Sequence, residues 1–230
     1  MIFPKGLIVS CQALEGNPFR NSELLAVMAK AAELGGAKAI RANGVDDIQA
    51  IRRQVTIPII GINKKKDSNN RTVITPSLDC VKEIIDAGAD IIALDATTYP
   101  GDIREDPYNM IRQIHDRFGV PVMADISTLH EACLADEAGA DAISTTLAGY
   151  VPGALHKDSE LYKPDLSLLQ SILDKKLGCL IVAEGRFWDR TDVAKAFAMG
   201  IDAIVIGKAI TNPMAITKYF NACIEGENNS

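Results

Sequence analysis

Eight short hydrophobic runs recur along the chain, and a polar residue follows or closes most of them. The runs are nearly continuous rather than alternating and are rich in branched side chains, which is typical of parallel strands buried on both faces. They span residues 7–11, 37–40, 57–62, 91–94, 120–124, 142–145, 179–183 and 203–206. The polar residues that follow them are Gln12, Arg41, Lys64, Asp95, Asp125, Thr146, Glu184 and Lys208.

Helical patterns lie between these runs. Residues 21–34 and 193–199, for example, carry apolar side chains at spacings of three and four, and glycine repeatedly separates such a stretch from the next run. Strand and helix therefore alternate along the chain. Eight such units in 230 residues favour an α/β fold of one domain, a closed (β/α)8 TIM barrel, over an open doubly wound sheet of eight strands.

Composition agrees with a single domain. The chain is 47% hydrophobic and 23% charged, and no stretch rich in proline, glycine or serine divides it. We expect residues 1–224 to form the barrel and residues 225–230 to be a disordered tail.

The net charge and the lengths of the apolar segments indicate where the protein resides and which kinds of partner it does not bind. A net charge of -6 argues against general nucleic-acid binding, and the basic run Lys64–Lys66 is too short to form a nucleic-acid patch. No apolar segment approaches the roughly 20 residues needed to cross a bilayer, and the N-terminus lacks the features of a secretory signal. We expect a cytoplasmic protein without a membrane or nucleic-acid partner.

Cysteine and histidine give little sign of redox or metal chemistry. The five cysteines show no Cys-x-x-Cys spacing, so reduced thiols in the core are expected, with Cys11 as a weak candidate for the site because it precedes Gln12. The three histidines have no metal-binding spacing. We therefore expect no metal site, and we interpret His156 as a solvated loop residue rather than a substrate contact.

The candidate catalytic residues lie at the ends of the hydrophobic runs. Loops after the strands form the active face of such a barrel, so Lys64 after the third run and Glu184 after the seventh are the leading acid–base pair. The alternative for Lys64 is a solvated loop charge. Near the last two runs, Gly185, Arg186, Gly207 and Lys208 are arranged as a phosphate cradle would be, although ordinary strand-to-helix turns also contain such glycines.

Nine motifs in register resemble one family, that of N-acetylmannosamine-6-phosphate 2-epimerase (NanE). The resemblance runs from about residue 5 to residue 220. The motifs are GLIVSCQALEG (6–16), IRAN (40–43), PIIG (58–61), ITP (74–76), ADIIALDAT (89–97), MADIST (123–128), STTLAGY (144–150), AEGR (183–186) and AIT (209–211).

The resemblance implies a (β/α)8 barrel that interconverts N-acetylmannosamine 6-phosphate and N-acetylglucosamine 6-phosphate, a step in the use of sialic acid. It implies no cofactor and a homodimer. By similarity Lys64 and Glu184 are catalytic, whereas Gln12, Arg41 and Asp125 hold the sugar. Thr146 is a further substrate-binding candidate.

Inverting C2 requires a base and an acid flanking one carbon. A lysine can serve as the base only if burial or neighbouring cations lower its pKa, and Lys65, Lys66 and Arg41 are candidates for those cations. Arg41 is also expected to stabilise charge that develops on O1 of the sugar. The alternative for Arg41 and Asp125 is a structural ion pair at the barrel mouth, and for Asp95 a role in orienting loops.

The chain departs from the family pattern in two places. Asn212 stands where members usually carry an arginine that could bind phosphate, and we expect Lys208 to restore a cation there. The segment 64–72 also differs, which makes Lys65 a reserve candidate for the base. Two other functions stay open: another phosphate-binding barrel isomerase, and a sugar-phosphate sensor without catalysis.

Overall fold

Eight parallel strands close into a barrel in the computed structural model, which describes residues 3–99, 103–151 and 163–225. The first strand pairs with the last, so the predicted barrel is confirmed and the open sheet is wrong. Around the barrel the order is β1-β10-β9-β8-β7-β6-β3-β2. These strands are β1 (Gly6–Cys11), β2 (Ala39–Asn43), β3 (Ile59–Ile62), β6 (Ile91–Asp95), β7 (Val122–Asp125), β8 (Ala142–Ser144), β9 (Leu180–Glu184) and β10 (Ala203–Ile206).

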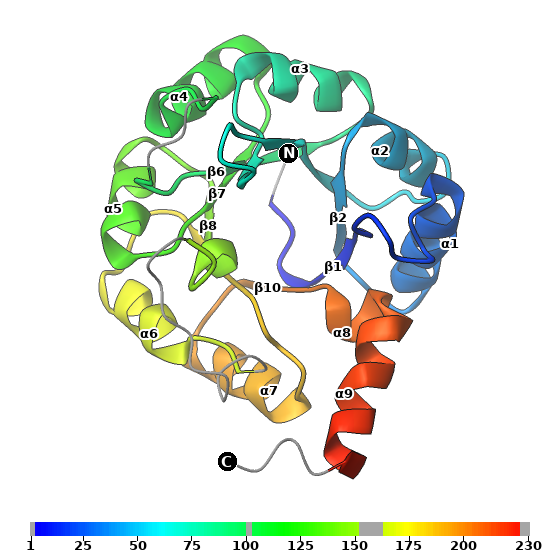
Figure 1. Cartoon of the computed structure of the whole chain (residues 1–230). Helices are drawn as coiled ribbons and strands as arrows, with labels where there is room; N and C mark the ends of the chain where they lie inside the picture. The colour runs from blue at the N-terminus through cyan, green and yellow to red at the C-terminus, as the bar shows by residue number, and fades with distance from the viewer. Residues whose placement is uncertain (1–2, 100–102, 152–162, 226–230) are drawn as a thin grey trace.

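Helices surround the barrel, as Figure 1 shows. They are α1 (Ser22–Leu34), α2 (Val45–Arg52), α3 (Leu78–Asp86), α4 (Pro107–Phe118), α5 (Leu129–Glu137), α6 (Leu166–Asp174), α7 (Arg190–Met199), α8 (Lys208–Thr211) and α9 (Pro213–Glu225). Local signals set their ends: Asp106 caps α4 ahead of Pro107, and Gly119 ends it in the left-handed conformation at φ 64°. None of the helices in the described ranges is long and apolar enough to cross a membrane.

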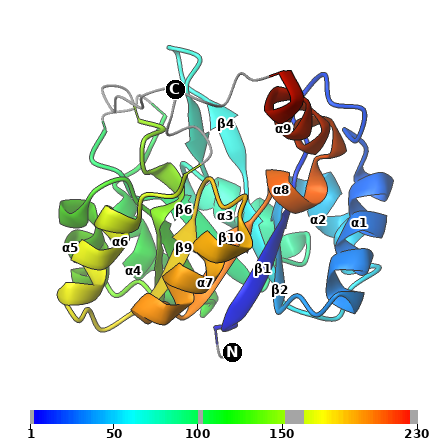
Figure 2. The same cartoon turned by 90° about the horizontal axis from the view of Figure 1, so that it is seen from below.

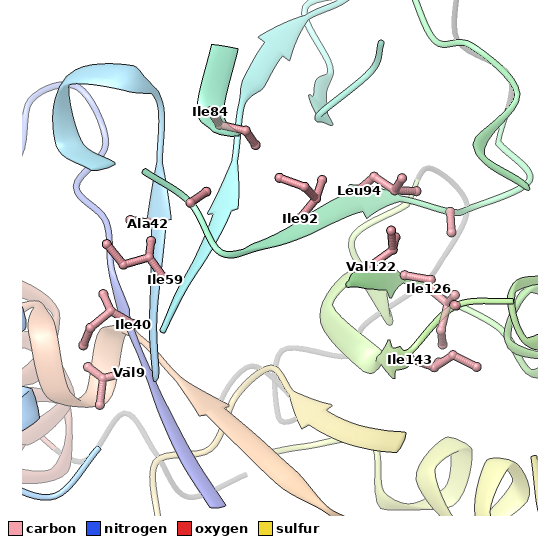
Figure 3. Close-up of a cluster of buried hydrophobic side chains, with 14 of the residues drawn as sticks. Val9, Ile40, Ala42, Ile59, Ile84, Ile92, Leu94, Val122, Ile126 and Ile143 are labelled. Atoms are coloured by element: carbon pink, nitrogen blue, oxygen red, sulfur yellow. The ribbon is translucent and has the colours of Figure 1, made fainter. Parts of the chain in front are cut away.

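Alternate residues of each strand enter two different hydrophobic clusters. Every barrel strand places at least one residue in the cluster inside the barrel, among them Ile8, Ala39, Ile60, Ile91, Met123, Ala142, Val182 and Ala203. Their neighbours, such as Val9, Ile40 and Ile92, belong to the cluster between strands and helices that Figure 3 shows. Both faces of the sheet are therefore buried, which explains why the strands read as continuous hydrophobic runs.

The same alternation turns the polar strand ends into the barrel. Met123 lies inside and Ala124 outside, so Asp125 points inward again. Arg41 lies two residues after the inward-facing Ala39, and Glu184 lies two residues after the inward-facing Val182, so both also point into the barrel. The carboxyl end of the barrel is thus lined by polar side chains directly above its apolar interior.

Several predicted boundaries require correction. The second strand runs from Ala39 to Asn43 rather than over 37–40, so Arg41 lies within the strand and not beyond its end. Thr146 lies in a 3-10 helix (Thr145–Leu147) because the sixth barrel strand already ends at Ser144. Glu225 ends α9 instead of beginning a tail, and residues 226–230 lie outside the described part of the chain, as does His156.

A β-hairpin after the third barrel strand was not predicted. Its strands β4 (Lys64–Lys66) and β5 (Thr72–Ile74) pair antiparallel, with Lys64 opposite Ile74. Figure 2 shows β4 rising above the barrel at the carboxyl end of the strands. The segment 64–72, interpreted from sequence as a loop, is therefore ordered structure at the barrel mouth.

Candidate active site

A cavity of about 510 Å³ opens at the carboxyl ends of the strands. Gln12, Lys64, Thr146 and Glu184 line it. These residues come from four different units of the barrel, and the position matches the face where enzymes of this fold place their chemistry. Further lining residues, including Lys208 and Lys218, extend the cavity toward α8 and α9.

Lys64 enters this cavity from the first position of the hairpin. Its backbone N–H donates to Asn43 Oδ1 at 2.9 Å, and its Nζ donates to Gln12 Oε1 at 2.7 Å. Lys65 turns the other way, toward Glu83 at 3.7 Å, and is largely exposed. Because neighbouring residues of a strand face opposite sides, Lys64 and not the reserve candidate Lys65 faces the cavity.

The pKa of the Lys64 amine is lowered to about 8. Burial is the main cause, because the charged form loses hydration, and the nearby Arg41 guanidinium is the second; Glu184 and Asp125 oppose the shift. Lys208 adds a smaller lowering effect. Of the three cations that the sequence suggested, Arg41 contributes to the lowering, whereas Lys65 and Lys66 are not among its main causes. A substantial fraction of Lys64 is neutral near physiological pH and able to accept a proton.

Arg41 is buried with two carboxylates. Its guanidinium donates to Asp125 Oδ1 at 2.9 Å and Oδ2 at 2.5 Å, and its Nη1 donates to Glu184 Oε2 at 2.7 Å. The side chains of Arg41 and Asp125 are 1% and 0% exposed. The ion pair that the sequence left as an alternative is therefore formed, and contact of either residue with a sugar stays a prediction.

Thr146 lies at the centre of this cluster. Its hydroxyl oxygen is 2.6 Å from Asp125 Oδ1, 2.8 Å from Ser144 Oγ and 2.9 Å from Glu184 Oε2. Thr145 fixes the backbone beside it, because its hydroxyl donates to Glu184 O and accepts from Glu184 N. Ser144 was not predicted as a site residue. Its position two residues after the inward-facing Ala142 was the signal that could have identified it.

The pKa of Glu184 is raised. Burial is the main cause and the Asp125 carboxylate adds to it, whereas Arg41, Thr146 and Lys64 favour the ionised form. A carboxyl group whose pKa is raised and an amine whose pKa is lowered are complementary as acid and base. The arrangement is suited to moving a proton at a carbon held between them.

The predicted phosphate residues border the other part of the cavity. Gly185, Arg186, Gly207 and Lys208 all line it. Gly185 adopts φ 108°, which other residues rarely reach, and Gly207 lies so close to Ser10 that an added Cβ would approach its Cβ to 3.3 Å. The guanidinium of Arg186 donates to the backbone oxygens of Lys163 and Ala148, so it also ties two loops together.

Asn212, which stands where the family pattern has an arginine, caps the last helix, and Lys218 of that helix borders the cavity. Asn212 caps α9: its side-chain oxygen accepts from Ala215 N at 3.0 Å, and Pro213 begins the helix. Lys218, one and a half turns later, lines the same cavity as Lys208. Neither side-chain amine has an ion-pair or hydrogen-bond partner among the described residues. Lys218 was missed because a lysine in a helix after the last strand carries no distinguishing pattern.

Other sequence candidates lie outside this cavity. Asp95 pairs with two arginines at the barrel mouth. Cys11 is buried, and burial raises the pKa of its thiol to about 12, which opposes a nucleophilic role. Within the described residues, no group of three or more histidine, cysteine, aspartate or glutamate side chains is arranged to hold a metal ion.

Comparison with known proteins shows which family the chain belongs to. The family model described as "Putative N-acetylmannosamine-6-phosphate epimerase" matches residues 25–226. The chain belongs to this NanE family. Its NanE relatives include "Putative N-acetylmannosamine-6-phosphate 2-epimerase" of Caldanaerobacter subterraneus, 46% identical over 94% of this chain and 89% of the relative. The relative of the same name from Clostridioides difficile is 42% identical over 95% and 96% of the two chains.

A solved NanE structure has the same fold. The N-acetylmannosamine-6-phosphate 2-epimerase from Clostridium perfringens superposes with a TM-score of 0.87 at 38% identity, covering 95% of this chain and 93% of that one. Thiamine phosphate pyrophosphorylase from Pyrococcus furiosus, at 16% identity and a TM-score of 0.57, shares the fold alone. The family resemblance found in the sequence is confirmed.

The lowered pKa of Lys64 has a measurable effect on stability. Between about pH 8 and the ordinary lysine pKa of about 10.4, the unfolded chain binds more protons than the fold, so this residue's contribution to stability rises with pH. We expect the wild type to gain about 2 kcal/mol in free energy of unfolding relative to Lys64→Met between about pH 7.5 and about pH 10. Urea unfolding at both pH values measures it.

Lys175→Met is the control, because Lys175 is exposed at the end of α6. Its pH dependence should equal that of the wild type. The same pH dependence in Lys64→Met would contradict a buried amine with a lowered pKa.

Proposed function

We propose that this protein interconverts N-acetylmannosamine 6-phosphate and N-acetylglucosamine 6-phosphate by moving the proton at C2. The observation that carries the proposal is the pairing of Lys64, an amine with lowered pKa, with Glu184, a carboxyl group with raised pKa, on one cavity. The substrate named for the relatives carries an acidic C2 proton only when its ring is open and C1 is an aldehyde. Such a reaction serves the use of sialic acid, and its phosphorylated substrate fits the cytoplasmic location expected from the sequence.

In the proposed reaction the neutral amine of Lys64 removes the C2 proton. The electron pair of the C–H bond forms the C1–C2 double bond, and the aldehyde oxygen becomes the oxygen of an enediolate. Glu184 then gives its proton to C2 on the opposite face while the carbonyl re-forms. Lys64 ends as an ammonium and Glu184 as a carboxylate, and one proton passed between them through solvent restores the starting state. In the reverse direction the two roles exchange.

The buried cluster supports the acid role of Glu184. Arg41 and Thr146 hold its carboxyl group in one orientation, while Asp125 raises its pKa. Gln12 holds the amine of Lys64 in place, because its Oε1 accepts a hydrogen bond from Lys64 Nζ at 2.7 Å. Reacting groups that are already fixed lose little entropy on reaching the transition state. Contacts of Gln12, Arg41, Asp125 and Thr146 with the sugar are part of this proposal.

The cavity also provides the cations for a phosphate group. Lys208 and Lys218 border its end near Gly185 and Gly207, and their mutual repulsion favours an anion between them. Tyr219, next to Lys218, stacks on Trp188 at 4.9 Å between ring centroids, which fixes α9 relative to the loop after β9. We therefore assign the phosphate to this end, with Lys208 and Lys218 in place of the arginine absent at 212.

The exchange of the C2 proton tests the reaction directly. In D2O, the purified protein should convert N-acetylmannosamine 6-phosphate to its epimer with deuterium at C2, seen by proton NMR. Lys64→Met and Glu184→Gln should each slow this by about 10² or more, since each removes a proton-transfer group. Lys65→Met, next to Lys64 but facing Glu83, is the matched control and should stay within about threefold of the wild type.

Two outcomes would redirect the assignment. Stabilisation by the sugar phosphate without any deuterium incorporation would support the sensor function. Rapid isomerisation of a different sugar phosphate, with no reaction of this one, would support another barrel isomerase.

The phosphate assignment predicts a separate effect on affinity. Lys208→Ser and Lys218→Ser should each raise KM about tenfold with kcat little changed, because a charge-assisted contact remote from C2 is lost equally in ground and transition states. Lys175→Ser is the control for a lost surface charge. Unchanged KM in both variants would place the phosphate elsewhere.

We also propose that the protein is a homodimer. Figures 1 and 2 show α9 running outward at the rim instead of lying beside β10, where a regular barrel has its last helix. An apolar groove of about 390 Å³ remains there, lined by Leu7, Phe197 and Ile204 among others. On α9 itself, Phe220 and Ile224 are 61% and 83% exposed. A second copy of this chain would bury both surfaces, since apolar area of this extent favours association.

Replacing Phe197 by glutamate should shift the protein from dimer to monomer in light scattering coupled to gel filtration, because it places a charge in the groove. Leu34→Glu is the control, since Leu34 is an exposed apolar residue, 78% against 38% for Phe197, that does not line the groove. A wild type that is monomeric at micromolar concentration would refute the dimer.

A further inference from the structure

Lys64 is the first residue of the β4–β5 hairpin, so its position depends on how the hairpin is held. At the base, Asn63 N donates to Thr75 Oγ1 at 3.1 Å and Thr75 N donates to Asn63 O at 3.0 Å. The Thr75 hydroxyl also donates to Ala93 O of β6 at 2.7 Å. Thr75 adopts φ 50°, an unusual conformation for a branched residue. The lower end of the hairpin is thus tied to β6.

The tip of the hairpin has its own internal support. Asp67 Oδ1 accepts from Asn69 N at 3.0 Å and from Arg71 N at 2.8 Å, which closes the turn between the two strands. These bonds fix the backbone of Arg71 relative to β4. They do not attach the hairpin to the barrel.

Arg71 attaches the tip of the hairpin to the barrel, whereas Lys64 at its base is attached through Asn43. Its Nη2 donates to Asp95 Oδ2 at 2.8 Å, and its guanidinium carbon lies 4.5 Å from the centroid of the Tyr99 ring. Asp95 is the last residue of β6 and its side chain is 2% exposed, whereas that of Arg71 is 15% exposed. A buried, charge-assisted contact with ring stacking is stronger than a surface ion pair.

Asp95 binds two arginines at once, Arg71 and Arg104. Its other oxygen accepts from Arg104 Nη1 at 3.0 Å and from Thr97, both in the segment that follows β6. Two further nitrogens of Arg71, Nε and Nη1, are buried without a hydrogen-bond partner within the described ranges. Asp95 is therefore the main polar anchor of Arg71, and loss of Arg71 still leaves Asp95 paired with Arg104.

We propose that Arg71 is a positioning residue: by binding Asp95 it holds the hairpin closed over the barrel mouth and thereby keeps the amine of Lys64 in the cavity. This inference rests on the proposed function of Lys64. Arg71 touches none of the groups that we assign to the reaction. It acts through the strand pairing of β4 with β5, in which Lys64 lies opposite Ile74.

Release of the hairpin should change how Lys64 titrates. The groups that face its amine are Gln12, Arg41, Asp125, Glu184 and Lys208, from β2, β7, β9 and the two segments that follow β1 and β10. Because burial is the main cause of its lowered pKa, a hairpin that opens to water returns the amine toward its ordinary pKa. The neutral base then appears only at higher pH.

The test compares Arg71→Met with Arg104→Met in the full chain. Each variant removes one arginine from Asp95, but only the first releases the hairpin. For Arg71→Met we expect kcat to fall about tenfold, since small displacements of a reacting group are costly. The acidic limb of kcat/KM should also move to higher pH, with KM changed less than about threefold. Arg71→Lys, which keeps the charge, should recover part of both effects, and Arg104→Met should leave the acidic limb unchanged.

Hydrogen exchange gives a readout that does not need activity. Amides of residues 64–66 and 72–74 should exchange at least about tenfold faster in Arg71→Met than in the wild type, and at the wild-type rate in Arg104→Met. If exchange and the pH profile of Arg71→Met match the wild type, the positioning role is wrong. If both variants shift the pH profile equally, the effect belongs to Asp95 and the role is also wrong. A wild type that exchanges no deuterium at C2 refutes the proposed function, while the amide exchange still decides whether Arg71 holds the hairpin.

Discussion

The guanidinium of Arg41, buried inside the mouth of the barrel, sets the conditions for the rest of the site. A cation there is tolerated because the carboxyl groups of Asp125 and Glu184, from β7 and β9, accept its hydrogen bonds and Asp125 forms a buried ion pair with it. Burial by itself would lower the pKa of Arg41, but the two carboxylates raise it on balance. The ion cluster therefore joins three strands that are distant in sequence, and it leaves the fold with a fixed charge directly beside Lys64 and Glu184.

That fixed charge has opposite effects on its two neighbours. Arg41 lowers the pKa of Lys64 by repulsion, in addition to the larger effect of burial. For Glu184 it favours the ionised form, but burial and Asp125 prevail and the pKa is raised. The low dielectric constant of a buried site strengthens all of these electrostatic interactions. The same burial that makes the cluster costly in folding thus brings an amine and a carboxyl group toward proton affinities at which both can exchange protons.

Much of this could be predicted from the pattern of the sequence. Continuous apolar runs gave the strands, and the polar residues at their ends gave most of the cluster, because the period of two in a strand turns Arg41, Asp125 and Glu184 to one side. The boundaries of β2 and β8 were harder to predict from the sequence. In β2 the reason is Arg41, because a buried arginine inside a strand is not expected until its carboxylate partners are known. The hairpin was hidden because Lys64–Lys66 has no apolar alternation, and its pairing with Thr72–Ile74 depends on tertiary contacts such as Arg71 with Asp95.

The two ends of the cavity are built from different kinds of structure. Lys64 and Glu184 stand on or directly beside barrel strands whose side chains are packed on both faces, whereas Lys218 belongs to α9, an exposed helix that begins at the Asn212 cap. Changes in α9 disturb little of the core, while changes around Arg41 disturb several strands at once. In the course of evolution such a barrel can vary the end of its cavity that α9 borders and keep the end around Lys64 and Glu184 intact.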